Sequence, residues 1–192
     1  MKIFDISFPR CGTTSTSTFL ADLGFKPCES DPQLTKSLFE DKLDWSNVDT
    51  NDAFGDIPFA LPRVYVAAKY RYPDSKFILH TRPVEDWLRS IEGLLNIVPY
   101  PDYLVENRKE EFLLNTELYG YFKFHRVIFS QIFLSRIQTA LTVFSSCLER
   151  LLVIDLYSDR NADQIMDFVG VRKNSIFPHH NKQMLGKVKL YD

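Results

Sequence analysis

The pattern of apolar and polar positions predicts three β-strands spread along the chain. Residues 2–8 alternate in polarity and are rich in β-formers, which predicts the first strand at Lys2–Phe8. Lys76–Thr81 is a second run rich in β-formers, and Leu151–Asp155 is a third. The third run is continuously apolar, which is typical of a buried parallel strand.

Segments with a helical period separate these strands. We expect helices at Thr13–Leu23, near Gln33–Leu43, at Pro62–Tyr72, from Pro83 to about Gly93, over most of Tyr103–Arg150 with a break near Gly120, and at Asp163–Gly170. Loops are expected at Asn96–Pro101 and in the polar tail Ile176–Asp192. Because strands alternate with helices, the sequence predicts an α/β fold with a central parallel sheet covered by helices on both faces.

The length of 192 residues is typical of a single domain. Residues 26–58 are rich in Pro, Asp and Asn, which predicts loops around one short helix and not a separate domain. We therefore interpret residues 1–192 as one domain, in which residues 26–60 and 94–125 are insertions on the substrate side.

Composition and charge narrow the classes of partner. Hydrophobic residues make up 45% of the chain and charged residues 25%, as in an ordinary soluble protein. The net charge is −2 and no long basic run occurs, so a nucleic-acid polymer is not expected as a partner, although a local cluster can still bind a small anion. Cys11, Cys28 and Cys147 form no CxxC motif, which argues against a disulfide framework and a thiolate zinc site. The sequence shows no clear metal cluster.

Neither the N-terminus nor the longest apolar stretch of the chain suggests a membrane segment. The N-terminus carries an acidic residue, Asp5, and its apolar run is too short for a signal peptide. The longest apolar stretch, Val127–Leu134, is far shorter than a bilayer span. We therefore expect no membrane span and a cytoplasmic location, while the sequence leaves the oligomeric state open.

The turn between the first strand and the first helix is a candidate anion site. In such a turn, free backbone N–H groups and the positive end of the helix dipole face the ligand. Arg10 adds a cation, and Thr13 and Thr14 add hydroxyl donors. The turn is not a Walker A motif, because Thr13 stands where that motif has lysine. We expect it to bind a phosphate-like group without nucleotide triphosphate chemistry; the alternative is a Thr-capped helix that binds nothing.

A second candidate anion site follows the strand at residues 76–81. Arg82 stands at the carboxyl end of that strand, where open α/β sheets bind ligands, and arginine can fork onto a phosphate. Ser90 follows eight residues later, about 12 Å along the helix. A phosphate lying along this helix would contact both. The alternative is that Arg82 pairs with a surface carboxylate such as Asp86 and that Ser90 is solvated.

These motifs resemble those of one enzyme family. Phe8–Thr14, with the sequence FPRCGTT, resembles the 5′-phosphosulfate loop of sulfotransferases, and residues 77–90 resemble their 3′-phosphate motif. Weaker similarities to a compact, prokaryote-like branch of this family occur at Gly55–Pro58, Tyr119–Gly120, Leu151–Leu156 and Phe177–Asn181. The matching blocks occur in order between residues 3 and 181.

The resemblance implies a three-layer, P-loop NTPase-like fold and transfer of a sulfuryl group from 3′-phosphoadenosine-5′-phosphosulfate (PAPS). The acceptor would be a hydroxyl or amine of a small molecule or carbohydrate, and the product nucleotide 3′,5′-adenosine diphosphate (PAP). By the resemblance, Arg82 and Ser90 hold the 3′-phosphate. The residues implied at the 5′-phosphosulfate are Arg10, Cys11, Gly12, Thr13, Thr14 and Ser15.

Two departures from the family pattern affect this assignment. Arg10 replaces the lysine that the family usually has in this loop. Arginine keeps the charge but cannot donate a proton to the leaving phosphate. The Arg-Lys-Gly phosphate motif of the steroid and phenol enzymes is missing from the sequence. The candidates to replace it are Asn181, Lys182 and Lys187.

Transfer to an acceptor requires a general base and stabilisation of the leaving phosphate. We assign the second role to Arg10. Asp56, in a Gly-Asp-Ile-Pro turn between the two phosphate motifs, is the first candidate for the base. His80 is the second, because it shares a strand face with Arg82, but it is also interpreted as a packed strand residue. His125 is a third candidate and is more often a structural residue.

Two other functions remain open. A P-loop small-molecule kinase would bind ATP with magnesium, against which the missing lysine counts. A sulfotransferase-like domain that only binds a nucleotide or a partner would carry the same motifs without transferring sulfate. His179 and His180, in the tail, either cover the nucleotide or have no role in the site.

Overall fold

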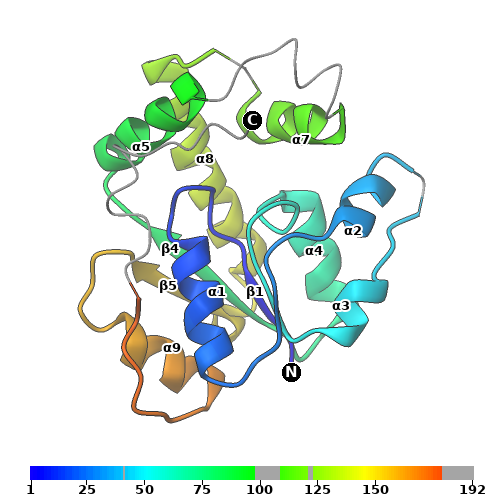
Figure 1. Cartoon of the computed structure of the whole chain (residues 1–192), viewed down its shortest axis with the longest axis vertical. Coiled ribbons are helices and arrows are strands. Elements are labelled where there is room, and N and C mark those ends of the chain that lie inside the picture. The colour runs from blue at the N-terminus through cyan, green and yellow to red at the C-terminus, as the bar shows by residue number, and fades with distance from the viewer. Residues whose placement is uncertain (41, 98–108, 121–122, 179–192) are drawn as a thin grey trace, which may run out of the picture.

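The chain forms a five-stranded parallel sheet, as a computed structural model of residues 1–40, 42–97, 109–120 and 123–178 shows (Figure 1). The strands are β1 (Ile3–Asp5), β2 (Pro27–Cys28), β3 (Ala53–Phe54), β4 (Lys76–Thr81) and β5 (Leu151–Asp155), in the order β2-β3-β1-β4-β5. The chain adds β2 and β3 on one side of β1 and then crosses to β4 on the other. The carboxyl end of β1 is therefore the switch point at which open α/β sheets bind ligands.

Helices cover both faces of the sheet, which confirms the predicted layers. The helices are α1 (Thr13–Asp22), α2 (Pro32–Ser37), α3 (Ser46–Thr50), α4 (Pro62–Arg71), α5 (Val84–Ile97), α7 (Lys109–Tyr119), α8 (Arg126–Phe144), the short 3₁₀ helix η1 (Leu148–Arg150) and α9 (Asn161–Val169). Successive strand residues point to opposite faces. Phe4 and Phe77 pack in a core with α4, α5 and α8, whereas Ile3 and Ile78 pack with α1 and α9, the pair in front of the sheet in Figure 1.

Local sequence signals explain where several helices begin and end. Pro62 stands in the first turn of α4, where its missing N–H costs nothing. Asp31 caps α2, because its Oδ1 accepts a hydrogen bond from the Leu34 amide at 2.9 Å. Gly24 and Gly170 follow α1 and α9 with φ angles of 99° and 75°, as left-handed helix ends require.

The predicted elements match the observed ones best around the two phosphate motifs. β4 has the predicted bounds, and α1 ends one residue before its predicted end at Leu23. β1 is shorter than predicted, since it ends at Asp5. α5 continues to Ile97, so the first two residues of the loop predicted at Asn96–Pro101 are helical. The rest of that loop and the tail beyond Pro178 lie outside the described residues.

Two predictions about the sheet were wrong. Residues 26–58 were expected to be loops around one helix, but they contain β2 and β3 in addition to α2 and α3. Strands of two residues carry too little pattern to be recognised in a sequence. β5 was expected to be buried on both faces, but it is an edge strand and Val153 is 42% exposed.

Within the described residues, one helix, α8, is long and apolar enough to cross a membrane when only length and composition are considered. Its side chains Phe129, Phe133 and Phe144 are buried in the protein interior. A helix that supplies a protein core passes the same test, so α8 is weak evidence for a membrane segment.

Candidate functional site

The loop between β1 and α1 favours glycine at position 12, because its φ is positive and the side chain of Leu156 lies close by. Gly12 caps α1 with a φ of 87°, and a Cβ atom at this position would lie 2.4 Å from Cδ1 of Leu156. Leu156 follows β5 directly, so the loop is pressed against the end of that strand. Arg10 also has a positive φ, of 70°, which is uncommon for a residue with a side chain.

Aromatic side chains fix the loop from the other side. The indole N–H of Trp87, on α5, donates to the Pro9 carbonyl at 2.9 Å. The ring of Phe8 lies 5.3 Å from that of Trp87 and 5.5 Å from that of Tyr119. These buried contacts hold the loop in place before any ligand binds, so the site is preorganised.

The first turn of α1 has the polarity of an anion site. It begins at Thr13 and contains no acidic residue, and its N-cap residue, Gly12, has no side chain to cap it. Thr13 and Ser15 are buried, and Thr14 is half-buried. The positive end of the helix dipole and the backbone N–H groups of this turn therefore favour a negatively charged ligand.

The two predicted anion sites meet in one place. Nη1 of Arg82, at the end of β4, donates to the carbonyl oxygen of Arg10 at 2.8 Å. Nε of Arg10 donates to the hydroxyl of Ser90, on α5, at 3.0 Å. Residues more than 70 positions apart thus join the loop, the strand end and the helix into a single basic site.

Arg82 does not pair with Asp86, the surface partner considered as an alternative. Its Nη2 donates to the hydroxyl of Tyr157 at 2.6 Å, and its guanidinium lies 5.4 Å from the centre of that ring. Asp86 pairs with Arg89 instead. Among the described groups, Nε of Arg82 is buried and has no hydrogen-bond partner, so this guanidinium does not use all of its donors within the described protein.

Asp56 lies on the other side of the loop, after β3. Its φ of 59° directs the chain out of the strand, and the next peptide bond, Ile57–Pro58, is cis. The pKa of its carboxyl group is raised to about 6, mainly by burial; the Ile57 amide and Arg10 lower it, while the nearby carboxylates of Asp5 and Glu29 also raise it. A carboxyl group that titrates near neutrality beside a basic loop is suited to accept a proton.

Comparison with known proteins decides the family. A family model described as a sulfotransferase domain matches residues 2–184.

The chain belongs to the sulfotransferase family.

The crystal structure of a sulfotransferase from Alicyclobacillus acidocaldarius has a TM-score of 0.55 to this chain, with 12% sequence identity, and the match covers 92% of this chain and 83% of that one. At this identity the similarity shows a shared α/β, P-loop-like fold alone. No curated protein sequence matches the chain. The family match supports sulfotransferase activity in general.

Besides Thr13 and Ser15, two further residues that the sequence placed in the sulfotransferase site, His80 and Cys11, have buried side chains. His80 is 1% exposed, and its Nε2 lies 2.7 Å from the hydroxyl oxygen of Thr16 on α1. Burial lowers the pKa of His80, which favours the neutral ring of a packed strand residue. The thiol of Cys11 is fully buried and its pKa is raised by burial, while its amide donates to the Phe8 carbonyl at 3.1 Å. Neither side chain is positioned to meet an acceptor without rearrangement.

Of the remaining candidates, one caps a helix and the others fall outside the described residues. His125 is exposed and caps α8 through Nδ1, which accepts from the Ile128 amide at 3.5 Å. His179, His180, Asn181, Lys182 and Lys187 fall in the tail that the structure does not describe. Across the described ranges, no group of three or more His, Cys, Asp or Glu side chains is arranged to hold a metal ion.

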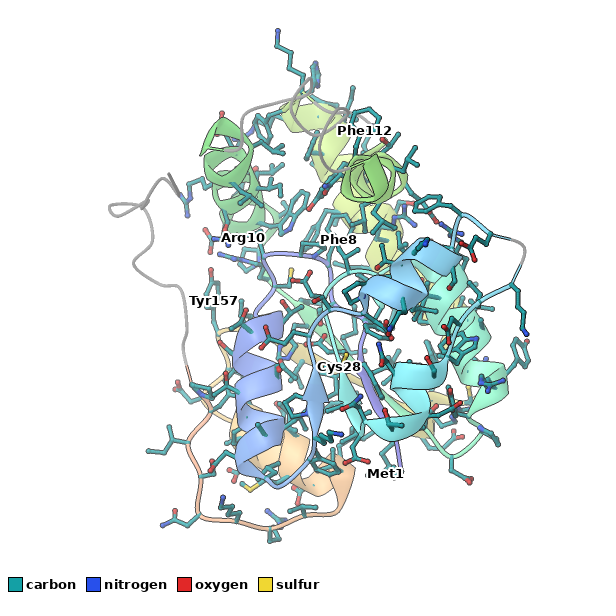
Figure 2. The ribbon with its side chains drawn as sticks, turned by 45° about the vertical axis from the view of Figure 1, so that its right-hand side comes forward. Met1, Phe8, Arg10, Cys28, Phe112 and Tyr157 are labelled. Carbon is teal, nitrogen blue, oxygen red and sulfur yellow. The ribbon has the colours of Figure 1, made fainter. Side chains whose placement is uncertain are left out.

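Sequence reasoning missed Tyr157, which contacts the predicted 3′-phosphate arginine. Figure 2 shows Arg10 and Tyr157 on the same side of the molecule, close to the start of α1. The available signal was its place: two residues after the third predicted strand, where a parallel sheet gathers ligand-binding side chains. No pattern in the surrounding residues distinguishes it from an ordinary loop tyrosine.

Proposed function

We propose that this sulfotransferase moves a sulfuryl group from PAPS to a hydroxyl or amine acceptor. The observation that carries the proposal is the contact between the two anion sites, made by Arg82 with the Arg10 carbonyl and by Arg10 with Ser90. A ligand with two separate anionic groups matches this arrangement better than one with a single phosphate. PAPS carries a 5′-phosphosulfate and a 3′-phosphate on one adenosine.

The residues present fit this donor. The first-turn amides of α1, the hydroxyls of Thr13, Thr14 and Ser15, and Arg10 would hold the 5′-phosphosulfate at the positive helix end. Arg82 would hold the 3′-phosphate together with Ser90, and its Nε–H, a buried donor without a partner in the described part of the chain, fits this assignment. Gly12 lets the backbone approach, while Cys11 contributes to the loop by packing into the core.

In the proposed reaction, an acceptor oxygen or nitrogen bonds to sulfur as the bond from sulfur to the 5′-phosphate oxygen breaks. Asp56 takes the proton that the acceptor loses, and PAP leaves with the electron pair of the broken bond. Arg10 and the helix-start amides stabilise the negative charge that develops on the leaving phosphate. This catalysis consists of positioning and electrostatic stabilisation by the residues of the loop.

We expect kcat/KM to rise with pH through an inflection near pH 6 and to level off above it. Asp56 accepts a proton only when it is ionised, and its pKa is raised to about 6, so activity is lost as the pH falls through that value. Initial rates at a low PAPS concentration, measured from pH 5 to 8, report this group in the free enzyme. A flat profile over this range would exclude Asp56 as the base.

We further propose that the acceptor is a small molecule or carbohydrate and that the protein acts in the cytoplasm. The family match supports the first statement, and a composition typical of a soluble protein together with the fold of a bacterial sulfotransferase supports the second. We assign residues 26–60 to the side of the site that binds the acceptor. They contain Asp56, which lies near Arg10 of the loop, and Glu29, which lies near Asp56.

A thermal-shift comparison of PAP with ATP–magnesium tests the donor. We expect PAP to raise the melting temperature, because both anion sites bind it, and ATP–magnesium to have a much smaller effect, because the loop has no Walker lysine. A larger shift with ATP–magnesium would favour a P-loop kinase. Binding of PAP without sulfate transfer to any acceptor in a broad screen would favour a non-catalytic domain.

A further inference from the structure

Tyr157 contacts Arg82 and lies near Asp86. Its hydroxyl accepts from Nη2 of Arg82 at 2.6 Å. Burial is the main cause that raises the pKa of this hydroxyl, and the neighbouring Asp86 carboxyl group also raises it. The three side chains come from three different segments: the end of β4, the first turn of α5 and the loop after β5.

The backbone around Tyr157 is held by the sheet. Parallel pairing of β4 with β5 places Thr81 beside Asp155, and the Leu156 amide continues the ladder by donating to the Thr81 carbonyl at 2.8 Å. The Tyr157 amide then donates to Oδ1 of Asp155 at 2.9 Å, which closes a turn directly after the strand. The position of the phenol relative to Arg82 is thereby set by strand register.

We propose that Tyr157 is a positioning residue that holds the Arg82 guanidinium for the 3′-phosphate and so makes the site prefer nucleotides that carry this group. The inference rests on the proposed function. Tyr157 and the Arg10 carbonyl each accept one N–H of Arg82. An arginine has five N–H donors, so three remain for a phosphate, enough for a two-point contact.

The contacts of Tyr157 indicate a role in positioning Arg82 and not in stabilising the protein core. Its side chain is 43% exposed, so it adds little to the protein core. Tyr157 contacts Arg82 in two ways. Its hydroxyl accepts a hydrogen bond from Arg82 at 2.6 Å, and the centre of its ring lies 5.4 Å from the Arg82 guanidinium carbon. Holding a flexible arginine in its bound geometry saves the entropy that ordering it would cost during binding.

Calorimetric titration of Tyr157→Phe with PAP and with 5′-AMP tests the proposal. The two nucleotides differ only in the 3′-phosphate, and phenylalanine keeps the ring over Arg82 but removes the hydroxyl. We expect Kd for PAP to rise about tenfold and Kd for 5′-AMP to stay within about twofold, because one hydrogen bond to a charged group is lost. In an Arg82→Ala background the same substitution is expected to have no further effect on PAP.

A matched control is Tyr70→Phe, which removes the hydroxyl of a 77% exposed tyrosine on α4 and should change neither affinity. Equal weakening of both nucleotides by Tyr157→Phe would contradict the positioning role, and so would an unchanged preference for PAP. A wild-type protein that binds PAP no better than 5′-AMP would overturn the proposed donor, and this inference with it. A wild-type preference that survives the substitution would overturn the inference alone.

Discussion

Replacing Asp56 with asparagine is expected to lower kcat by about 10²–10⁴-fold, the range typical of a lost general base. Asparagine has nearly the same shape and tolerates the positive φ of 59° at this position, so the turn should persist. The amide cannot accept the acceptor proton, whereas the nucleotide contacts of Arg10 and Arg82 remain. Kd for PAP should therefore stay within about threefold of the wild-type value, as steady-state kinetics and calorimetry can show together.

Asp74→Asn, in the exposed turn before β4, is the matched control and should leave kcat unchanged. The Asp56 variant should also lose the inflection near pH 6, since we assign that inflection to the Asp56 carboxyl group. A near-normal rate for Asp56→Asn would transfer the role of base to another group. Its lowered pKa and 1% exposure make His80 a poor substitute without a movement of α1.

Replacing Arg82 with alanine is expected to raise Kd for PAP about 100-fold while Kd for 5′-AMP changes far less. A two-point, charge-assisted contact to the 3′-phosphate would be lost, and each such hydrogen bond contributes about 1.5–3 kcal/mol. Arg82→Lys should give an intermediate loss, because lysine keeps the charge but not the fork. Calorimetry with both nucleotides separates this effect from a general loss of binding.

Arg82 also donates to the Arg10 carbonyl, so its removal can loosen the loop. A thermal melt without ligand checks whether the fold survives, and Arg71→Ala, which removes a half-exposed arginine at the far end of α4, is the control. Unchanged affinity of a folded Arg82→Ala variant for PAP would contradict the assignment of the 3′-phosphate site. Equal losses for PAP and 5′-AMP would indicate a role in holding the loop and not in phosphate recognition.

Local patterns in the sequence were sufficient for the parts of the site that lie on one strand, one turn and one helix. β1, Gly12 and α1 form the predicted strand–turn–helix unit, because alternation, a glycine and a helical period act within about twenty residues. Arg82 falls at the end of β4 as predicted, since a strand of six residues has a clear pattern. The α/β fold follows from the same alternation of elements.

Contacts between distant segments required the tertiary structure. The order of the strands makes β5 an edge and lets Val153 face solvent, and the short strands β2 and β3 have too few residues to be recognised. The bond between Arg10 and Ser90, and the one between Arg82 and Tyr157, join residues 80 and 75 positions apart. Hydrophobic periodicity reports which face of an element is buried, but not which element it packs against, so strand pairing and helix packing together decided which side chains share the site.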